Sequence, residues 1–258
     1  MSKSTAVESS TKFEQLLRAS VQLPGVQINR ETYLRRELKL YCSPEQIDRA
    51  VTTSPARAGV PIEVVNKIAA HVIRNEAAKV TAISAAAGLP GGVALLGTVP
   101  ADLAQYYGHV LRIVQKLAYI YSWPSLFDSD GLDSATENML ILFIGVMFGV
   151  NAAQAGVTKT AAMIAQQMAK TLPQKALTKG AIYPVVKKVA QILGVRMTTQ
   201  IFAKGASKVI PVVGAALSGG LTAATFLPMA KRLQKHLVSL PLANQEPDII
   251  DAEVIEES

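Results

Sequence analysis

Cysteine, aromatic residues and strand-like patterns are scarce in this sequence. Cys42 is its one cysteine, which excludes an internal disulfide and fits a reducing compartment. Aromatic residues make up 5% of the chain, and no alternation of apolar and polar residues is long enough to predict a strand. Long runs of small apolar residues favour closely packed helices instead. We therefore predict an all-α fold, a multi-helix bundle whose central apolar helices and hairpins are rich in small residues.

Acidic residues are absent from a long internal part of the chain. No Asp or Glu occurs between Glu137 and Glu246, an interval that contains twelve Lys and Arg residues. The segment 244–258 reverses this pattern, with six acids and no base. A solvated helix surface normally carries both signs of charge. A surface of one sign therefore indicates an anionic partner, which could be phospholipid headgroups, nucleic acid or the chain's own acidic tail.

Motifs for catalysis, metal binding and nucleotide binding are also missing. His71, His109 and His236 are scattered, without an HExxH pattern or a Cys/His pair, and the acids at 128–137 lack the spacing of a calcium loop. The stretch GLPGG at 88–92 lacks the lysine and hydroxyl residue that complete a phosphate-binding loop. We expect a protein that is not an enzyme, with no catalytic residue, metal ligand or cofactor.

Composition divides the chain into three parts. Residues 1–12 are rich in Ser and Thr and have no apolar core, so we expect a disordered N-terminal tail and no secretory signal. Residues 13–240 carry the helical pattern of a single domain. Residues 241–258 form an acidic tail that we expect to be disordered. This tail either solubilises the chain or docks on a partner protein or on the chain's own basic face.

Start signals place several helices in the first half of the domain. Asn29 is expected to cap one helix. Ser43, followed by Pro44 and Gln46, is expected to cap the next helix. Pro61 then opens a long helix with apolar residues at helical spacing.

A hinge rich in small residues interrupts the apolar pattern at 85–103. The stretch AAAGLPGGVALLGTVPADL has one charge in nineteen residues, with four glycines and two prolines. It is too apolar for a surface loop and too broken for one helix, so it is predicted to turn one apolar helical segment against another. The residues assigned to the hinge and to the start of the following helix are Gly88, Pro90, Gly91, Gly92, Pro100 and Asp102.

Three windows contain no charged residue: 80–101, 139–157 and 209–230. Each is about long enough to cross a bilayer, which needs roughly 20 apolar residues, but core helices surrounded by other helices give the same pattern. The sequence leaves both interpretations open. We expect the window 139–157 to lie in one helix. The small residues expected to permit close helix packing are Gly145, Gly149, Ala215, Gly219 and Ala223.

Basic residues flank the apolar segments and do not form one compact cluster. This arrangement suits a headgroup layer beside a hydrophobic surface, where each base near an anionic membrane contributes about 1 kcal/mol. Nucleic-acid binding would typically add aromatic residues for stacking or a recognition helix, and neither is obvious. The residues expected to contact lipid headgroups are Lys187, Lys188, Arg196, Lys204, Lys208, Lys231, Arg232 and Lys235.

Four stretches together resemble the EcsC family of bacterial proteins over most of the chain. They are LPGVQINRETYLRREL at 23–38, AAAGLPGGVALLGTVPADL at 85–103, RIVQKLAYIYSWP at 112–124 and IPVVGAALSGG at 210–220. The resemblance implies a helical bacterial protein that associates with a membrane. The founding member is encoded beside an ABC transporter, which implies a role in export only loosely. The family has no agreed chemistry, so no catalytic residue is carried over.

The sequence thus predicts a non-enzymatic, membrane-associated helical protein of the bacterial cell envelope. We expect it in the cytoplasm, at the inner face of the cytoplasmic membrane, with anionic lipid as its partner. One alternative is a membrane-permeabilising toxin or defence effector that oligomerises in lipid. The other is a nucleic-acid-binding helical protein. The oligomeric state is left open.

Overall fold

The described part of the chain is an all-α bundle, as predicted. The computed structural model describes residues 3–87, 95–96, 99–127, 131–167, 170–206 and 211–248. Its helices are α1 (Lys3–Val21), α2 (Arg30–Leu38), α3 (Pro44–Thr52), α4 (Ile62–Ala87), α5 (Ala101–Ile120), α6 (Ser134–Met147), α7 (Asn151–Gln167), α8 (Gln174–Thr178), α9 (Tyr183–Ala206), α10 (Pro211–Val238) and the 3₁₀ helix η1 (Pro241–Asn244). Two antiparallel two-residue strands, β1 (Leu95–Leu96) and β2 (Val99–Pro100), precede α5.

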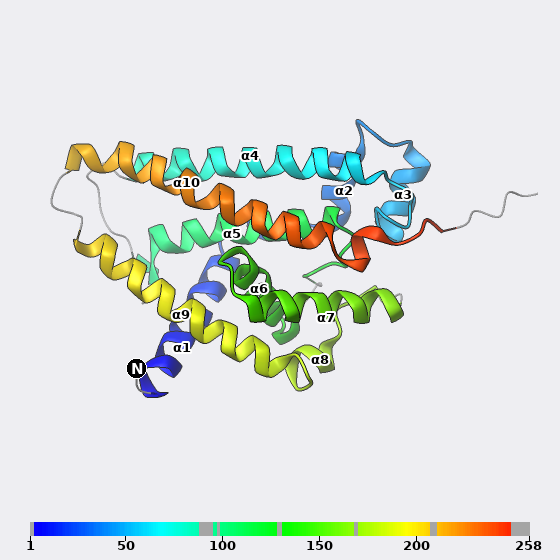
Figure 1. Ribbon diagram of the computed structural model, residues 1–258. Coiled ribbons are helices and arrows are strands. Elements are labelled where there is room, and N and C mark those ends of the chain that lie inside the picture. The colour runs from blue at the N-terminus through cyan, green and yellow to red at the C-terminus, as the bar shows by residue number, and fades with distance from the viewer. Residues whose placement is uncertain are drawn as a thin grey trace, which may run out of the picture.

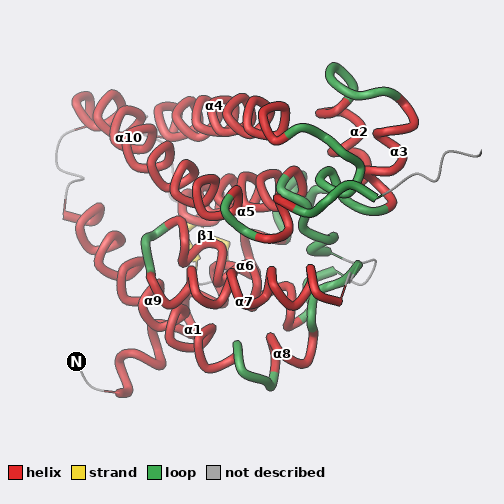
Figure 2. Tube along the Cα trace, turned by 45° about the vertical axis from the view of Figure 1, so that its right-hand side comes forward, coloured by secondary structure: helices red, strands yellow, loops and turns green. Residues whose placement is uncertain are grey.

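The helices surround α6, the most apolar of them. α4 and α10 pack along one another on one side, with α5 beside them, while α1 and α9 cross on the other side (Figure 1). α6 touches α5, α7, α8, α9 and α10, and a second view also places it in the middle of the domain (Figure 2). A helix that is apolar all round needs neighbours on every side, which explains this position.

The predicted helix starts in the first half of the domain are confirmed. The side chain of Asn29 accepts a hydrogen bond from the backbone N–H of Thr32 at 2.9 Å. Ser43 accepts one from the N–H of Gln46 at 3.2 Å. The long helix α4 begins one residue after Pro61. These caps are local in sequence, so the sequence alone locates them.

The window 139–157 forms two helices, so the prediction of one helix is wrong. α6 ends at Met147, and Gly149 adopts a φ of +74° in the turn before α7. The N–H of Gly149 donates to the carbonyl of Val146 at 3.0 Å, and the N–H of Val150 donates to the carbonyl of Gly145 at 2.8 Å. A glycine in the left-handed conformation is the usual way to end a helix in this manner. Gly149 is therefore a turn residue.

The rest of that apolar window is core. Every residue from Met139 to Met147 is buried. Gly145 lies against two neighbouring helices, because a Cβ built there would fall 2.6 Å from both Ala153 Cβ and Val189 Cγ1. The predicted close packing at Gly145 therefore holds, between α6, α7 and α9.

The described helices contain no segment that is both long and apolar enough to cross a membrane.

The N-terminal segment is helical where it was predicted to be disordered. α1 begins at Lys3, so the prediction of a disordered tail over residues 1–12 is wrong for its described part. Ser9 is buried where α1 crosses α9, and a Cβ at Gly194 would lie 2.2 Å from the Ser9 carbonyl oxygen. Such a close backbone approach requires the glycine, and it gives α1 a long-range contact that extends it toward the N-terminus.

The beginning of the acidic tail is also ordered. η1 follows α10, and its residues Leu242 and Ala243 are buried. The N–H of Asp248 donates to the carbonyl of Arg57 at 2.9 Å, which fastens the segment beside the connection between α3 and α4. The prediction of disorder over 241–258 is therefore wrong for residues 241–248, because part of this segment is apolar enough to pack.

For several of the predicted residues the structure describes the backbone alone, or does not describe the residue. α5 begins at Ala101, between Pro100 and Asp102, the two residues predicted to open it. The described part of the hinge window 85–103 covers the end of α4, both strands and the start of α5. Gly88, Pro90, Gly91, Gly92 and Lys208 lie outside the described residues. For Pro100, Asp102, Lys204, Ala215, Gly219 and Ala223 the backbone is helical or extended, and their side chains lie outside the described part.

Candidate functional site: a basic surface and a basic pocket

The exposed bases of α7–α10 and their connections form what we call the basic surface. In the described part of the chain none of them forms an ion pair with Asp or Glu, in contrast to the bases of α1, α2, α4 and α5. The reason is in the sequence, since no acid occurs between Glu137 and Glu246. The members of the basic surface are Lys159, Lys175, Lys179, Lys187, Lys188, Arg196, Lys231, Arg232 and Lys235, whereas Lys170 lines the pocket described below.

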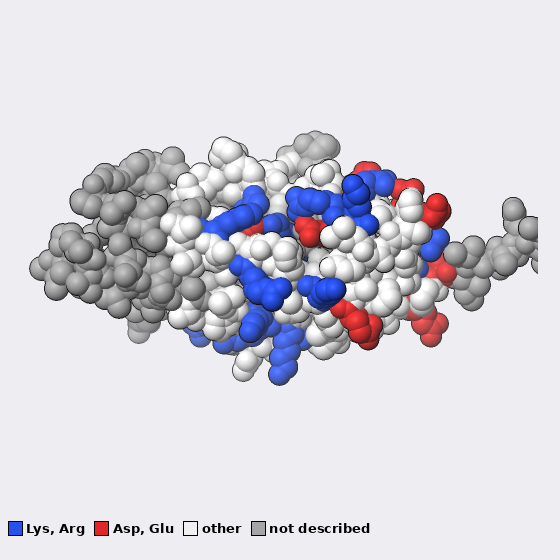
Figure 3. Space-filling model, turned by 90° about the horizontal axis from the view of Figure 1, so that it is seen from above, with Lys and Arg blue, Asp and Glu red and all other residues white. Residues whose placement is uncertain are grey.

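The two signs of charge are separated on the face that α4 and α10 present. Lys and Arg side chains are spread over the middle of this face, whereas Asp and Glu gather mainly at the end near α2 and α3 (Figure 3). Charges of one sign that lack close counter-charges produce a positive potential in their vicinity. The face that α4 and α10 present is thus suited to attract an anionic partner.

Two of the predicted lipid-contacting arginines have a structural contact as well. Arg196 on α9 donates a hydrogen bond to the carbonyl of Phe148, and Arg232 on α10 donates one to the carbonyl of Met147. These carbonyls end α6, where the helix dipole favours a cation. The end of α6 therefore brings one arginine of α9 and one arginine of α10 to adjacent carbonyls.

Four of the predicted lysines on these helices have described side chains, namely Lys187, Lys188, Lys231 and Lys235, and all four are exposed. Glu14 on α1 lies close enough to Lys187 to interact with it electrostatically. Lys187 lies over the ring of Tyr183, with Nζ 5.1 Å from the ring centroid. Lys188, Lys231 and Lys235 make no hydrogen bond or ion pair within the described residues. They are free to reach an external anion.

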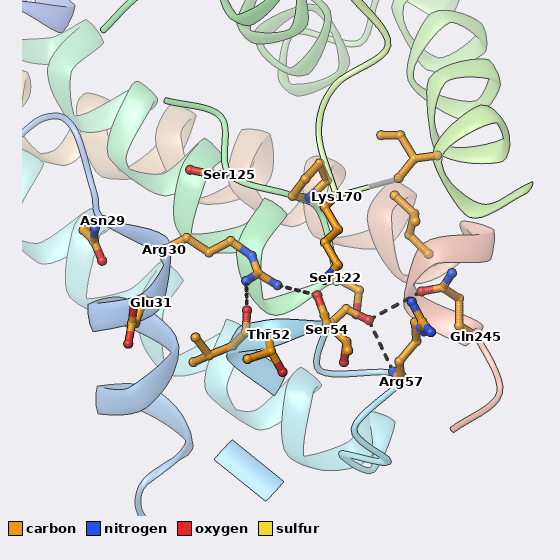
Figure 4. Close-up of a pocket in the computed structure, with 15 residues that line it drawn as sticks. Asn29, Arg30, Glu31, Thr52, Ser54, Arg57, Ser122, Ser125, Lys170 and Gln245 are labelled. Atoms are coloured by element: carbon orange, nitrogen blue, oxygen red, sulfur yellow. Dashed lines mark hydrogen bonds between the residues drawn. The ribbon is translucent and has the colours of Figure 1, made fainter. Parts of the chain in front are cut away.

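A second site is a cavity of about 340 Å³ at the other end of the domain. Its wall is formed by the start of α2, the end of α3, the α3–α4 and α5–α6 connections, α7, the α7–α8 connection, η1 and the residue after η1 (Figure 4). Its lining has three bases and one acid, namely Arg30, Arg57, Lys170 and Glu31. Hydroxyl groups come from Thr52, Thr53, Ser54, Ser122 and Ser125, and amides from Asn29 and Gln245. The apolar lining residues are Val51, Pro124, Ile164 and Leu242.

Arg30 brings a positive charge to this pocket without a carboxylate partner. Its guanidinium donates to the carbonyls of Trp123 at 3.1 Å, Val51 at 2.7 Å, Ala50 at 3.3 Å and Thr53 at 3.1 Å. These bonds satisfy backbone carbonyls at the end of α3 and connect them to Trp123, which follows α5. Burial lowers the pKa of Arg30 from its ordinary value, but a guanidinium stays charged in proteins. The pocket is therefore electropositive.

Two buried hydroxyls stand at the pocket wall. Ser122, which follows the end of α5, has a φ of +71°, and its Oγ accepts a hydrogen bond from the N–H of Ala56 at 3.0 Å. The Oγ of Ser54 accepts from the N–H of Arg57 at 3.3 Å and lies 3.4 Å from Oε1 of Gln245. A positive φ is uncommon for serine and costs of order 1 kcal/mol or more, so the surrounding structure imposes it.

The segment after η1 reaches the rim of the pocket. Nε and Nη2 of Arg57 both lie 2.8 Å from Oδ1 of Asp248. Together with the backbone hydrogen bond between the same two residues, this pair holds Gln245 against the cavity. An acid of the chain's own tail thus already engages a pocket base.

A buried charge cluster joins α4 to α5, and sequence reasoning missed it. Glu76 is fully buried and accepts hydrogen bonds from Lys116 and, at 3.1 Å, from His109, while Arg112 Nε and Lys79 Nζ lie at 3.5 and 3.6 Å. Burial raises the pKa of Glu76, but the hydrogen bonds and charges of its neighbours outweigh this and hold it at about 2. The carboxylate is therefore ionised and acts as a clamp. The spacing of His109, Arg112 and Lys116 on one face of α5 was the available signal.

Among the described residues no three His, Cys, Asp or Glu side chains come together as a possible metal site. No family model, curated protein or solved structure matches this chain. The likeness to the EcsC family therefore rests on the four sequence stretches alone.

Proposed function

We propose that this chain is a non-enzymatic, peripheral protein of the inner face of the bacterial cytoplasmic membrane, and that its basic surface binds anionic lipid. The observation that carries the proposal is the lack of any acid between Glu137 and Glu246, together with the lack of ion pairs for the described bases of α7–α10. Membership of the EcsC family is part of the same proposal, since that resemblance implies a membrane-associated helical protein.

The exposed lysines of α9 and α10 are numerous enough to give a measurable attraction to an anionic membrane. Each Lys or Arg close to an anionic membrane contributes about 1 kcal/mol. Four lysines on α9 and α10 would together contribute about 4 kcal/mol, which corresponds to roughly a thousandfold in the binding constant. Because these side chains are exposed, the attraction should be screened by salt.

Vesicle binding tests the proposal. The wild type should sediment with vesicles of phosphatidylglycerol and phosphatidylcholine, and far less with phosphatidylcholine alone. Lys231→Gln with Lys235→Gln removes two bases from α10 and should weaken binding roughly 30-fold, at about 1 kcal/mol for each base. The α9 variant Lys187→Gln with Lys188→Gln should behave similarly.

The matched control changes net charge by the same amount elsewhere. Lys39→Gln with Lys67→Gln removes two exposed lysines at the end of the domain where the acids gather. This variant should bind vesicles nearly as well as the wild type. An equal loss in the control would mean that net charge alone decides binding. Binding of duplex or single-stranded nucleic acid in place of vesicles would favour the nucleic-acid-binding alternative. Leakage of a dye from loaded vesicles would favour the membrane-permeabilising alternative.

A further inference from the structure

The pocket beside Ser122 is lined by a mixture of residues that lipid binding by the basic surface does not require. It lies where α2, α3 and the segment after η1 meet, at the acid-rich end of the domain, and it combines bases, hydroxyls and a small apolar wall (Figure 4). We propose that this pocket binds a small phosphorylated polyol, and that Asp248 competes with the phosphate for Arg57. The inference is independent of the lipid-binding proposal.

The balance of charge in the pocket favours an anion. The charge of Arg30 meets only carbonyl oxygens, and Lys170 forms no ion pair within the described residues. The one lining acid, Glu31, accepts a hydrogen bond from Nε of Arg35 at 2.9 Å, so a base outside the lining neutralises it. A ligand with negative charge therefore gains from the bases without strong repulsion from Glu31.

Asp248 shows where the anionic group of a ligand would sit. A single oxygen of this carboxylate receives both Nε and Nη2 of Arg57 at 2.8 Å, so the second oxygen is not used by that arginine. A phosphate monoester offers three terminal oxygens. It could take the place of the Asp248 carboxylate on Arg57 and also reach Lys170, which extends toward Ser122 in Figure 4.

The hydroxyls point to a polyol rather than to bare phosphate. Ser122 uses its Oγ as an acceptor for the Ala56 N–H, and within the described residues its own O–H donates to no other group. The strained backbone of Ser122 holds this donor at the pocket wall. With further hydroxyls in the lining and a volume of about 340 Å³, near the lower end of the range for small-molecule sites, the pocket fits a molecule of the size of glycerol phosphate or a small sugar phosphate.

Calorimetric titration with glycerol 3-phosphate tests this inference. The wild type should bind it, and Lys170→Gln should weaken the affinity about tenfold, as expected for one charge-assisted hydrogen bond. Asp248→Asn should tighten binding several-fold because it removes the internal competitor. Lys175→Gln, which removes an exposed base outside the lining, should change nothing. The Asp248→Asn result keeps the test valid if Lys170→Gln impairs folding.

The outcomes separate the possible sources of the ligand. Binding of soluble glycerol 3-phosphate that depends on Lys170 supports a free metabolite. Binding only to vesicles of phosphatidylglycerol, lost in Lys170→Gln but kept in the α10 variant, supports a lipid headgroup in the same pocket. Absence of both, or an Asp248→Asn variant that binds no more tightly than the wild type, would overturn the inference. Failure of vesicle binding with intact glycerol phosphate binding would overturn only the lipid-binding proposal.

Discussion

Glu76 on α4 and His109 on α5 face each other inside the domain, with Oε2 of the carboxylate 3.1 Å from Nδ1 of the imidazole. Lys116 completes the contact by donating to the other carboxylate oxygen. One acid thus holds several bases of α5 against α4, and it does so where water has no access to Glu76. Because α4 and α5 both pack against α10, this cluster also positions the helices that support the bases of α10.

Replacement of Glu76 by glutamine should destabilise the fold strongly. The change removes the counter-charge of Lys116, a base that is itself buried. Loss of one member of a buried ion pair typically costs about 3–5 kcal/mol. Urea unfolding of Glu76→Gln measures this loss. Glu63→Gln, at an exposed position in the first turn of the same helix, is the control and should lie within about 0.5 kcal/mol of the wild type.

The pH dependence of stability should carry the signature of Glu76. Its pKa is about 2 in the folded protein against an ordinary value of 4.5, so the ionised group contributes fully above pH 4.5 and loses its contribution as the pH falls toward 2. The total is about 3 kcal/mol. The difference between the unfolding free energies of the wild type and Glu76→Gln should therefore narrow as the pH falls from about 4.5 toward 2. A difference that stays constant over this interval would argue against the clamp.

Alanine at Gly145 should overpack the centre of the bundle. Its Cβ would approach Ala153 and Val189 to 2.6 Å, which forces one of the helices to move. Overpacking costs about 1–3 kcal/mol, and the better helix propensity of alanine returns up to about 1 kcal/mol. Thermal unfolding should show a net loss. Gly131→Ala meets no atom within 4 Å and should show only the backbone strain of its positive φ.

Order at the start of the tail depends on Leu242. This side chain is buried, so Leu242→Ala should cost about 2–3 kcal/mol in the free energy of unfolding. Glu246→Ala, at an exposed position four residues later, should cost almost nothing. If Leu242→Ala were as stable as Glu246→Ala, the segment after α10 would not belong to the domain.

The sequence located those features that depend on near neighbours. The caps at Asn29 and Ser43 bond to residues three positions away, so a short pattern is enough to predict them. The sequence left the apolar run from 139 to 147 open between a core helix and a membrane-crossing one, and in the structure every residue of this run is buried. Its end was missed because Gly149 looked like one half of a packing pair, whereas the fold uses its left-handed φ for a turn.

Features made by distant parts of the chain were missed. Helix α1 extends to Lys3 beside α9, where Ser9 meets Gly194, and periodicity in α1 alone does not indicate that contact. Glu76 finds its partners on the next helix, and the pocket joins segments as far apart as Arg30 and Gln245. Such sites depend on how helices pack, and each of their residues is ordinary within its own helix.

Fractionation of cells that make the untagged protein tests the central claim most directly. The membrane pellet is washed first with high salt and then with alkaline carbonate, and the protein is followed by immunoblot. Our account predicts that the protein pellets with membranes at low salt and that high salt releases it, because exposed bases on α9 and α10 hold it to anionic lipid and salt screens that attraction. Retention through both washes would contradict peripheral binding, and a protein that never pellets would contradict membrane association altogether.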